Sequence, residues 1–374
     1  MYVLSHFPKT LLITFFFLMV TGRSFAQIQP KQVDFSTEDG VLIKGTWYQS
    51  PKGGNSPVVL ILHDWGSDRS KNEWVNLATQ LQKNNFHVLT FDFRGHGESV
   101  TAAPKFWNYA IFGGNQLAKA PQDGKLDYKN FSRNYHSYLI NDIAAAKVFL
   151  DLKNDAGQCN SSSLILVGAG NGAALGSIWL NSEWYRHMYL LPNGVDPGGP
   201  NFNHVYGEDV VACVWLSYIN RVGAEFNGDK LNPRSPGYKF DVARILERPA
   251  LTNNTPMLFI YNPNDTWDKF ISPAIAKLIK DKSSKFNNKL TLAFPIKGAN
   301  ELKGRQLLQN SLNTNQAIVE YLTKAPIKMN VPRRQDFMGN QFLWVIGNQI
   351  IRINNRGANT LGYHSYLHFM PKKR

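Results

Sequence analysis

Short apolar runs that alternate with helix-like segments constrain the fold of this 374-residue chain more than any other feature. Six such runs contain almost no charged residue: 57–63 (PVVLILH), 86–91 (FHVLTF), 163–167, 210–216, 257–261 and 289–294. A strand that is apolar at successive positions is covered on both faces, which is typical of a parallel sheet between helices. Intervening segments place apolar side chains at helical spacing, at Trp74, Leu77, Ala78 and Leu81, and at Leu139, Ile140, Ile143, Ala144 and Ala146. The alternation over 32–324 therefore predicts an α/β domain with a mostly parallel sheet and helices on both faces.

Other segments depart from this alternation. Two strands, 33–37 and 41–47, are predicted at the start around a Glu-Asp-Gly turn. Three segments rich in glycine, proline and aromatic residues are predicted to be irregular insertions, and they lie near 100–135, 184–208 and 218–240. Loops of this kind shape the ligand-binding edge of open α/β sheets, so we expect them to line a cleft.

The first 26 residues resemble a secretory signal peptide. A ten-residue apolar core at 11–20 (LLITFFFLMV) follows Lys9, and Ser24-Phe25-Ala26 offers a small-residue cleavage site. The core is too short for a typical transmembrane helix of about 20 residues. We therefore expect an exported chain, periplasmic or secreted, that begins at residue 27 and has no transmembrane segment after cleavage. An uncleaved membrane anchor is the alternative.

From about residue 326 the strand–helix alternation stops. The segments 342–346 and 350–354 flank Gly347-Asn348, which predicts a hairpin, and 361–369 is a third candidate strand. We interpret 326–374 as a basic, β-rich appendage to a main domain at 27–325. Its charges contribute half of the chain's net charge of +14, through Lys328, Arg333, Arg334, Arg352, Arg356, Lys372, Lys373 and Arg374 against Asp336. Such a tail can bind an anionic polymer, whereas no accompanying signature favours nucleic acid.

Composition excludes several classes of protein. Apolar residues make up 43% of the chain and charged residues 18%, which is incompatible with disorder throughout. Only two cysteines are present, so a disulfide-built miniprotein and a multi-cysteine metal cluster are excluded. For an exported chain, Cys159 and Cys213 are either one disulfide or two separate buried thiols.

Three motifs resemble those of the α/β-hydrolase superfamily, in its esterase, lysophospholipase and serine-aminopeptidase-like branches. They are 61–66 (ILHDWG), close to the oxyanion loop, 92–99 (DFRGHGES), close to a second conserved turn of the family, and 164–172 (LILVGAGNG), at the place of the nucleophile elbow. The resemblance covers about residues 30–325. It implies an α/β-hydrolase fold with a catalytic triad of nucleophile, acid and histidine.

The resemblance places Gly170 at the nucleophile position, within 168–172 (GAGNG). Glycine has no side chain, so no acyl-enzyme can form there. Asp265 falls at the position of the acid, with Asp268 as the second choice. Lys303 falls at the position of the histidine, and His364 and His368 in the appendage are remote alternatives. We predict that Lys303 pairs with Asp265 in place of the missing histidine, because a lone buried carboxylate is costly.

The oxyanion-loop equivalents are His63, Asp64, Trp65 and Asn171. Where the family has a glycine after the histidine, this chain has Asp64. Its carboxylate would repel the negative charge that forms in an oxyanion hole, unless it points to solvent or caps the next helix. His63 and His96 are expected to orient loops through hydrogen bonds, and no metal site is predicted at either.

The glycines at 168–173 (GAGNGA) also fit a dinucleotide-binding pattern. The acidic residue that should follow about 20 residues later is missing, so no cofactor is expected.

The sequence thus predicts an exported pseudoenzyme whose cleft binds a small molecule or a protein. One alternative is an active esterase or peptidase that uses a displaced nucleophile, Ser67 or Ser99. Another is an envelope-associated binding protein that acts through the basic tail.

Overall fold

The computed structural model describes the greater part of the predicted main domain and a hairpin beyond it. Before residue 325 it describes 28–37, 39–108, 124–132, 135–185, 205–227, 230–239, 242–265, 268–283 and 289–324. After that it describes 327, 329, 331–333, 341–346 and 349–354. The predicted signal at 1–26, most of the insertion at 184–208, the candidate strand at 361–369 and both appendage histidines lie outside these residues.

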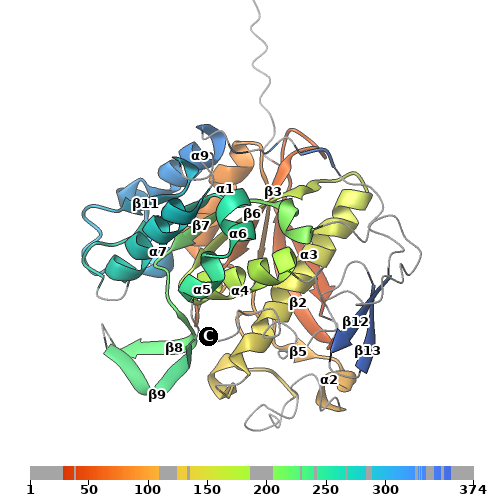
Figure 1. Cartoon of the computed structure of the whole chain (residues 1–374). Helices are drawn as coiled ribbons and strands as arrows, with labels where there is room; N and C mark the ends of the chain where they lie inside the picture. Colours follow the sequence, from red (N-terminus) through yellow and green to blue (C-terminus); the bar gives the residue numbers. More distant parts are fainter. Residues whose placement is uncertain are drawn as a thin grey trace, which may run out of the picture.

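A central sheet organises the described chain (Figure 1). Its order is β1-β2-β4-β3-β6-β7-β10-β11, and β5 pairs with β2. The first two pairings, β1–β2 and β2–β4, are antiparallel, and every pairing from β4 to β11 is parallel. The bounds are β1 Lys31–Ser36, β2 Val41–Tyr48, β3 Pro57–Leu62, β4 His87–Phe91, β5 Thr101–Ala102, β6 Asn160–Ala169, β7 Val210–Leu216, β10 Met257–Tyr261 and β11 Leu292–Pro295. The predicted mostly parallel sheet is confirmed.

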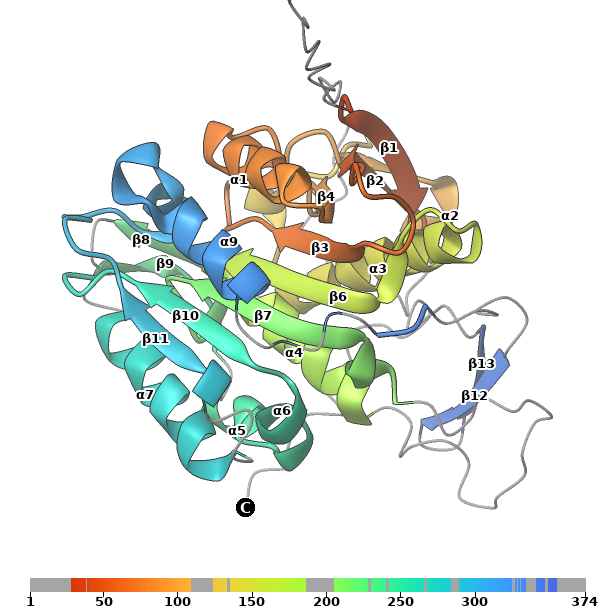
Figure 2. The same ribbon diagram turned by 90° about the horizontal axis from the view of Figure 1, so that it is seen from above.

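Helices cover both faces of this sheet (Figure 2). The α-helices are α1 Asn72–Lys83, α2 Pro104–Asn108, α3 Ile140–Asp155, α4 Asn171–Tyr185, α5 Val242–Leu246, α6 Pro249–Asn254, α7 Asp268–Lys282 and α9 Thr314–Lys324. Short 3-10 helices are η3 Tyr128–Asn130, η4 His136–Leu139, η6 Tyr206–Asp209, η7 Gly304–Leu308 and η8 Asn310–Leu312. The pleat of β3 divides the core in two, because Leu60 and Leu62 join the cluster on the α3–α4 face while Val59 and Ile61 join that of α1 and α9.

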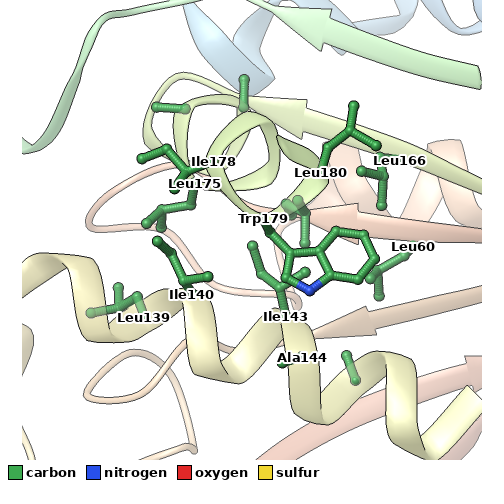
Figure 3. Packing of buried hydrophobic residues seen from close by; sticks show 14 of the residues in the cluster. Leu60, Leu139, Ile140, Ile143, Ala144, Leu166, Leu175, Ile178, Trp179 and Leu180 are labelled. Carbon is green, nitrogen blue, oxygen red and sulfur yellow. The ribbon is translucent and has the colours of Figure 1, made fainter. Parts of the chain in front are cut away.

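Trp179 of α4 fills the space between two layers (Figure 3). Its side chain is 1% exposed and lies among Ile143 and Ala144 of α3 and Leu60 and Leu166 of the sheet. The contact joins α3, α4 and two parallel strands in one apolar layer. This layer packs α4, whose first turn begins the candidate site, against the sheet.

The segment at 218–240 differs from the irregular insertion that was expected. It forms an antiparallel hairpin of β8 (Arg221–Asn227) and β9 (Lys230–Lys239), a two-stranded sheet of its own. The pair Gly228-Asp229 separates the two strands in the sequence and is a hairpin signal that the sequence interpretation overlooked.

The appendage contains the predicted hairpin. Strands β12 (Gln341–Ile346) and β13 (Gln349–Asn354) pair antiparallel, with Ile346 opposite Gln349. In the described part of the chain, no helix has the length and apolar character needed to span a membrane.

Cys159 and Cys213 are two separate buried thiols, the second of the two readings that the sequence left open. Cys213 of β7 lies opposite Leu166 of β6, and Cys159 precedes β6 by one residue. The two cysteines therefore lie at different levels along these neighbouring strands. Burial raises the pKa of Cys159 to about 12 and that of Cys213 well above its usual value, which keeps both thiols unreactive.

Candidate functional site

The turn from β6 into α4 has the geometry of a nucleophile elbow without a nucleophile. Gly170 stands between the two elements at φ 49°, in the left-handed region, and its N–H donates to the Leu216 carbonyl at 2.9 Å. A Cβ on Gly168 would lie 2.8 Å from the Ala173 nitrogen, and one on Gly172 would lie 2.4 Å from the Leu62 oxygen. Glycine is therefore required on both sides of the turn by close backbone packing.

Gly170 itself is different, because space is open above it. A Cβ placed there would meet the Cβ of Asp64 at 3.7 Å and, among the residues described, no other heavy atom beyond its own chain neighbours within 4 Å. That separation is an ordinary van der Waals contact. The position where the resemblance expects the nucleophile can thus hold a small side chain, and its neighbour across the open space is Asp64.

The Asp64 carboxylate points into the site. The sequence had left open whether it lies there, points to solvent or caps the next helix. Its Oδ2 lies 2.8 Å from where a Cβ on Gly304 would be and 3.7 Å from Nη1 of Arg305. The side chain is 19% exposed, and α1 is not capped by it, since Lys71 is the N-cap. Asp64 therefore reaches from the elbow to the loop that carries Lys303 and Gly304.

Burial dominates the electrostatics of Asp64. Desolvation raises the pKa of this carboxyl, and the Arg305 guanidinium opposes the shift only in part. The Ser67 hydroxyl also lowers the pKa of this carboxyl. Arg305 contacts Glu73 of α1 as well, with Nε 3.7 Å from Oε2. A partly buried carboxylate thus occupies the space beside Gly170, where negative charge would build up in an acyl transfer.

Lys303 and Asp265 form the predicted ion pair. Lys303 Nζ lies 3.9 Å from Asp265 Oδ1, and the Asp265 side chain is 3% exposed against 31% for Lys303. Asp265 follows β10 in a turn where its N–H donates to the Asn262 carbonyl at 3.0 Å. The Asn262 amide in turn donates to the carbonyl oxygens of Asn300 and Leu302, at 2.5 and 3.1 Å. These bonds hold the loop of Lys303 against the loop of Asp265.

Asp268, the second choice for the acid, has a different role. It begins α7 and accepts a hydrogen bond from the Ser272 hydroxyl one turn along the same helix. Burial raises the pKa of this carboxyl well above its usual value. Its contact with Ser272 fits the start of a helix, and Asp265 is the acid that faces Lys303.

Two further groups of the site, Ser217 and Arg305, were not predicted from the sequence. Ser217 follows β7 at φ 46°, and its Oγ accepts from the Gly304 N–H at 2.8 Å. Serine after a buried strand and arginine after Lys303-Gly304 were both visible in the sequence. Neither position falls in one of the three motifs that carry the resemblance, so only the fold reveals their contacts.

Both ring nitrogens of His63 lie within hydrogen-bond distance of backbone groups. His63 Nδ1 lies 2.8 Å from the Asp64 carbonyl, and Nε2 accepts from the Phe93 N–H at 3.0 Å. Burial lowers the pKa of His63 and lowers that of His96 well below its usual value, so both rings are neutral. The Nδ1 of His96 lies 3.1 Å from the Arg94 carbonyl. Neither imidazole is placed as a general base for a serine.

Trp65 and Asn171, the remaining oxyanion-loop equivalents, hold neighbouring elements. The Trp65 ring packs edge-on against His96, Tyr128 and His136, with centroid distances of 5.0, 5.3 and 4.7 Å. The Asn171 side-chain oxygen accepts from the Gly223 N–H at 2.6 Å and so ties the start of α4 to β8. The side-chain oxygen of Asn171 is therefore already hydrogen-bonded to a backbone N–H.

The displaced-nucleophile candidates are both buried. Ser99 is 0% exposed, and its Oγ accepts from the Lys44 N–H at 2.9 Å. Ser67 is 3% exposed, and its hydroxyl has no hydrogen bond to a histidine in the described structure. No group of three His, Cys, Asp or Glu residues that could hold a metal ion occurs among the residues described.

Comparisons with known proteins concern mainly the fold. No family model matches the chain. Over 54 residues it is 39% identical to lysophosphatidylserine lipase ABHD12 of Rattus norvegicus, a match that spans only 14% of each protein. Among solved structures, DcsB in complex with its substrate analogue is similar over 79% of this chain and 99% of its own, with TM-score 0.50 and 15% identity. Esterase Pf2001 of Pyrococcus furiosus gives TM-score 0.48 and 16% identity, over 79% and 93% of the two chains.

Proposed function

Because this chain has the α/β-hydrolase fold, we propose that it is a member without serine-hydrolase catalysis, a pseudoenzyme that binds a ligand in its cleft. One observation carries the proposal: the elbow holds Gly170, and the partly buried Asp64 carboxylate occupies the space beside it. The Lys303–Asp265 pair stands where a histidine–acid pair would activate a nucleophile. What remains, loops and helix N-termini, supports binding but supplies little rate enhancement.

The ligand of this cleft is a small molecule or a segment of a protein. An anionic acyl or phosphoryl group is disfavoured next to Asp64, since two negative charges in a poorly hydrated site repel strongly. We propose a ligand that presents a hydrogen-bond donor to the accessible part of the Asp64 carboxylate, whose side chain is 19% exposed. The substrate class in the name of ABHD12 is a weaker guide, because so little of that protein is matched.

An active hydrolase with a displaced nucleophile is the less favoured candidate. Ser99 is committed to a backbone N–H, and Ser67 is buried beside loops whose histidine is committed too. We also propose that the chain is exported and that its basic tail binds an anionic polymer at the cell envelope. Both parts of this proposal rest on the sequence features of 1–26 and 326–374.

A covalent probe tests the loss of catalysis. Fluorophosphonate labelling would be compared for the wild type, for Gly170→Ser with Lys303→His, and for the same pair combined with Asp64→Gly. We expect no labelling of the wild type and little of the double variant, because Asp64 still occupies the site. The triple variant should label at least about tenfold faster, since one carboxylate near an oxyanion hole opposes about as much as one donor supplies.

A matched control adds Asp265→Asn to the triple variant, which should reduce labelling by removing the partner of the new histidine. Labelling of the wild type would overturn the proposal, and mapping the tagged residue would identify Ser67, Ser99 or another nucleophile. If all variants fold and none labels, the assignment of Gly170 to the elbow is wrong.

A further inference from the structure

Three buried histidines gather around the ring of Trp65. His63, His96 and His136 are 2%, 1% and 5% exposed. Between ring centroids, His96 lies 5.2 Å from His63 and 5.0 Å from Trp65, and His136 lies 4.7 Å from Trp65. His96 also stacks on Tyr128, with centroids 4.1 Å apart and an angle of 13° between the ring planes. We call these five residues the histidine cluster.

The histidine cluster joins loops that are far apart in the sequence. Trp65 follows β3, His96 follows β4, and Tyr128 and His136 belong to η3 and η4. A Cβ on Gly223 of β8 would lie 1.9 Å from Nδ1 of His136, so the imidazole packs directly on that strand. The 3-10 helices η3 and η4 therefore meet the loops of the candidate site through these rings.

Backbone hydrogen bonds also hold η3 in place. We call residues 124–132 the η3 segment. The Leu126 N–H donates to the Val100 carbonyl at 2.8 Å, and the Tyr128 N–H donates to the Gly95 carbonyl at 3.2 Å. Both bonds cross from the η3 segment to the turn after β4. The amides of Leu126 and Tyr128 therefore report whether the segment is docked on that turn.

His96 is poorly placed to accept a proton. Its Nδ1 lies 3.1 Å from the Arg94 carbonyl, which fits a donated N–H on that nitrogen. Its Nε2 is buried and has no hydrogen-bond partner among the residues described. A second proton would therefore create a buried N–H without an acceptor, on a charged ring that water does not reach.

Carboxylates around the cluster offset this cost only in part. Asp64 and Asp68, after β3, and Asp92, after β4, favour the charged form of neighbouring imidazoles. Asp68 and Asp92 already form ion pairs with basic side chains. Burial has the larger effect, and it lowers the pKa of His63 and lowers that of His96 well below its usual value.

Cationic groups around the cluster disfavour protonation. A charge on His63 or His136 lowers the pKa of His96 further. From η3, Lys129 places its Nζ 5.9 Å from the centroid of the Tyr128 ring, on which His96 stacks. The Arg94 guanidinium is paired with two buried carboxylates, and the contact from β8 is a glycine.

We propose that protonation of the histidine cluster releases the η3 segment from the loops around Trp65, so that this side of the site opens in acid. In the open state water hydrates the imidazoles, which then bind protons that the docked state excludes. Falling pH therefore favours the open state. Opening separates Tyr128 from Trp65 and from Gly66, whose Cβ position lies 3.3 Å from the Tyr128 hydroxyl. The proposal is independent of whether the elbow supports catalysis.

Hydrogen–deuterium exchange of the folded protein at pH 7, 6 and 5 tests this opening, after correction for the exchange rate of unprotected amides. We expect the amides of Leu126 and Tyr128 to open more often than those of β3 and β6 at every pH. Between pH 7 and 5 their opening constant should rise about 20-fold for each histidine that becomes hydrated. An opening constant that does not change with pH, or that equals that of β6, would overturn the proposal.

Two variants identify the responsible ring. His96→Phe keeps a ring that can stack on Tyr128 but cannot gain a proton, so the rise between pH 7 and 5 should shrink by about 20-fold. His87→Gln is the matched control, because His87 is buried elsewhere, stacked on Trp47, and the rise should stay as in the wild type. His96→Gln replaces His96→Phe if the latter does not fold. A rise that survives the loss of His96 contradicts the proposal.

Discussion

At the scale of single residues, two glycines of the elbow are required for different reasons. Gly172 is required by close backbone contacts, whereas Gly170 has a positive φ and open space around it. Gly172→Ala would push a Cβ to 2.4 Å from the Leu62 oxygen and 2.5 Å from the His63 oxygen. Backbone atoms cannot yield cheaply, so we expect a loss of about 3 kcal/mol in the free energy of unfolding. Gly170→Ala meets only Asp64 at 3.7 Å and should cost about 1 kcal/mol, from its positive φ alone.

Denaturant unfolding of the two alanine variants measures this difference. Equal losses in the free energy of unfolding would mean that the backbone contacts of Gly172 are no more costly to disturb than the positive φ of Gly170. The comparison bears on function as well, because a tolerant Gly170 is what allows a serine to be introduced there.

At the scale of elements, one buried arginine joins three parts of the fold. Arg94, after β4, is 0% exposed and contacts Asp39 between β1 and β2 at 2.6 Å and Asp142 of α3 at 2.8 Å. Burial raises the pKa of Asp142 to about 6 although Arg94 lowers it. Arg94→Met would leave two buried carboxylates uncompensated, and we expect a loss of about 3–5 kcal/mol.

A surface pair provides the control for Arg94. Lys282 and Glu247 are 2.6 Å apart with side chains 47% and 34% exposed, so Lys282→Met should change stability by about 1 kcal/mol or less. Chemical denaturation of both variants at neutral pH makes the comparison. Similar losses in the two would show that the Arg94 network contributes no more than an exposed ion pair.

Secondary-structure elements were also the features that the sequence predicted best. Apolar runs such as 57–63 predicted parallel strands because β3 is buried on both faces, and its pleat sends alternate side chains to two cores. The β8–β9 hairpin was not anticipated, since its strands pair only with each other and carry no continuous apolar run. In the site, complementary charge predicted the Lys303–Asp265 contact. The inward orientation of the Asp64 side chain could not be predicted, because it depends on the absence of a side chain at Gly304, where a Cβ would lie 2.8 Å from Asp64 Oδ2.

At the scale of the whole molecule, four buried histidines make the fold sensitive to acid. Burial lowers the pKa of His87 and His136 to about 4 and also lowers those of His63 and His96. Between pH 6.5 and 4 the unfolded chain binds protons that the folded chain does not, so the free energy of unfolding falls as pH falls. For His87 alone the loss is on the order of 3 kcal/mol.

Urea denaturation at several pH values between 7 and 4.5 measures this dependence. Carboxyl groups with raised pKa values bind protons in the folded state over the same range, so they offset part of the loss of stability. His87 accepts from the Ser50 N–H and lies 3.0 Å from the Gly53 carbonyl, so His87→Gln keeps some of these bonds. We expect the variant to lower the pH slope by about one proton below pH 6.5. An unchanged slope would mean that His87 is protonated in the folded state.

The contact between Asp64 and Gly304 has an evolutionary consequence. With the Asp64 carboxylate over Gly304, a side chain at residue 304 would have to displace it and adopt a positive φ, and with Lys303 paired to Asp265, a lone return of serine at Gly170 gains no base. On the proposed function, a lineage that carries these changes would have to reverse several of them together before any reaction returned. Single substitutions, in contrast, suffice to change which ligand such a site binds, so the proposed loss of catalysis would be hard to reverse.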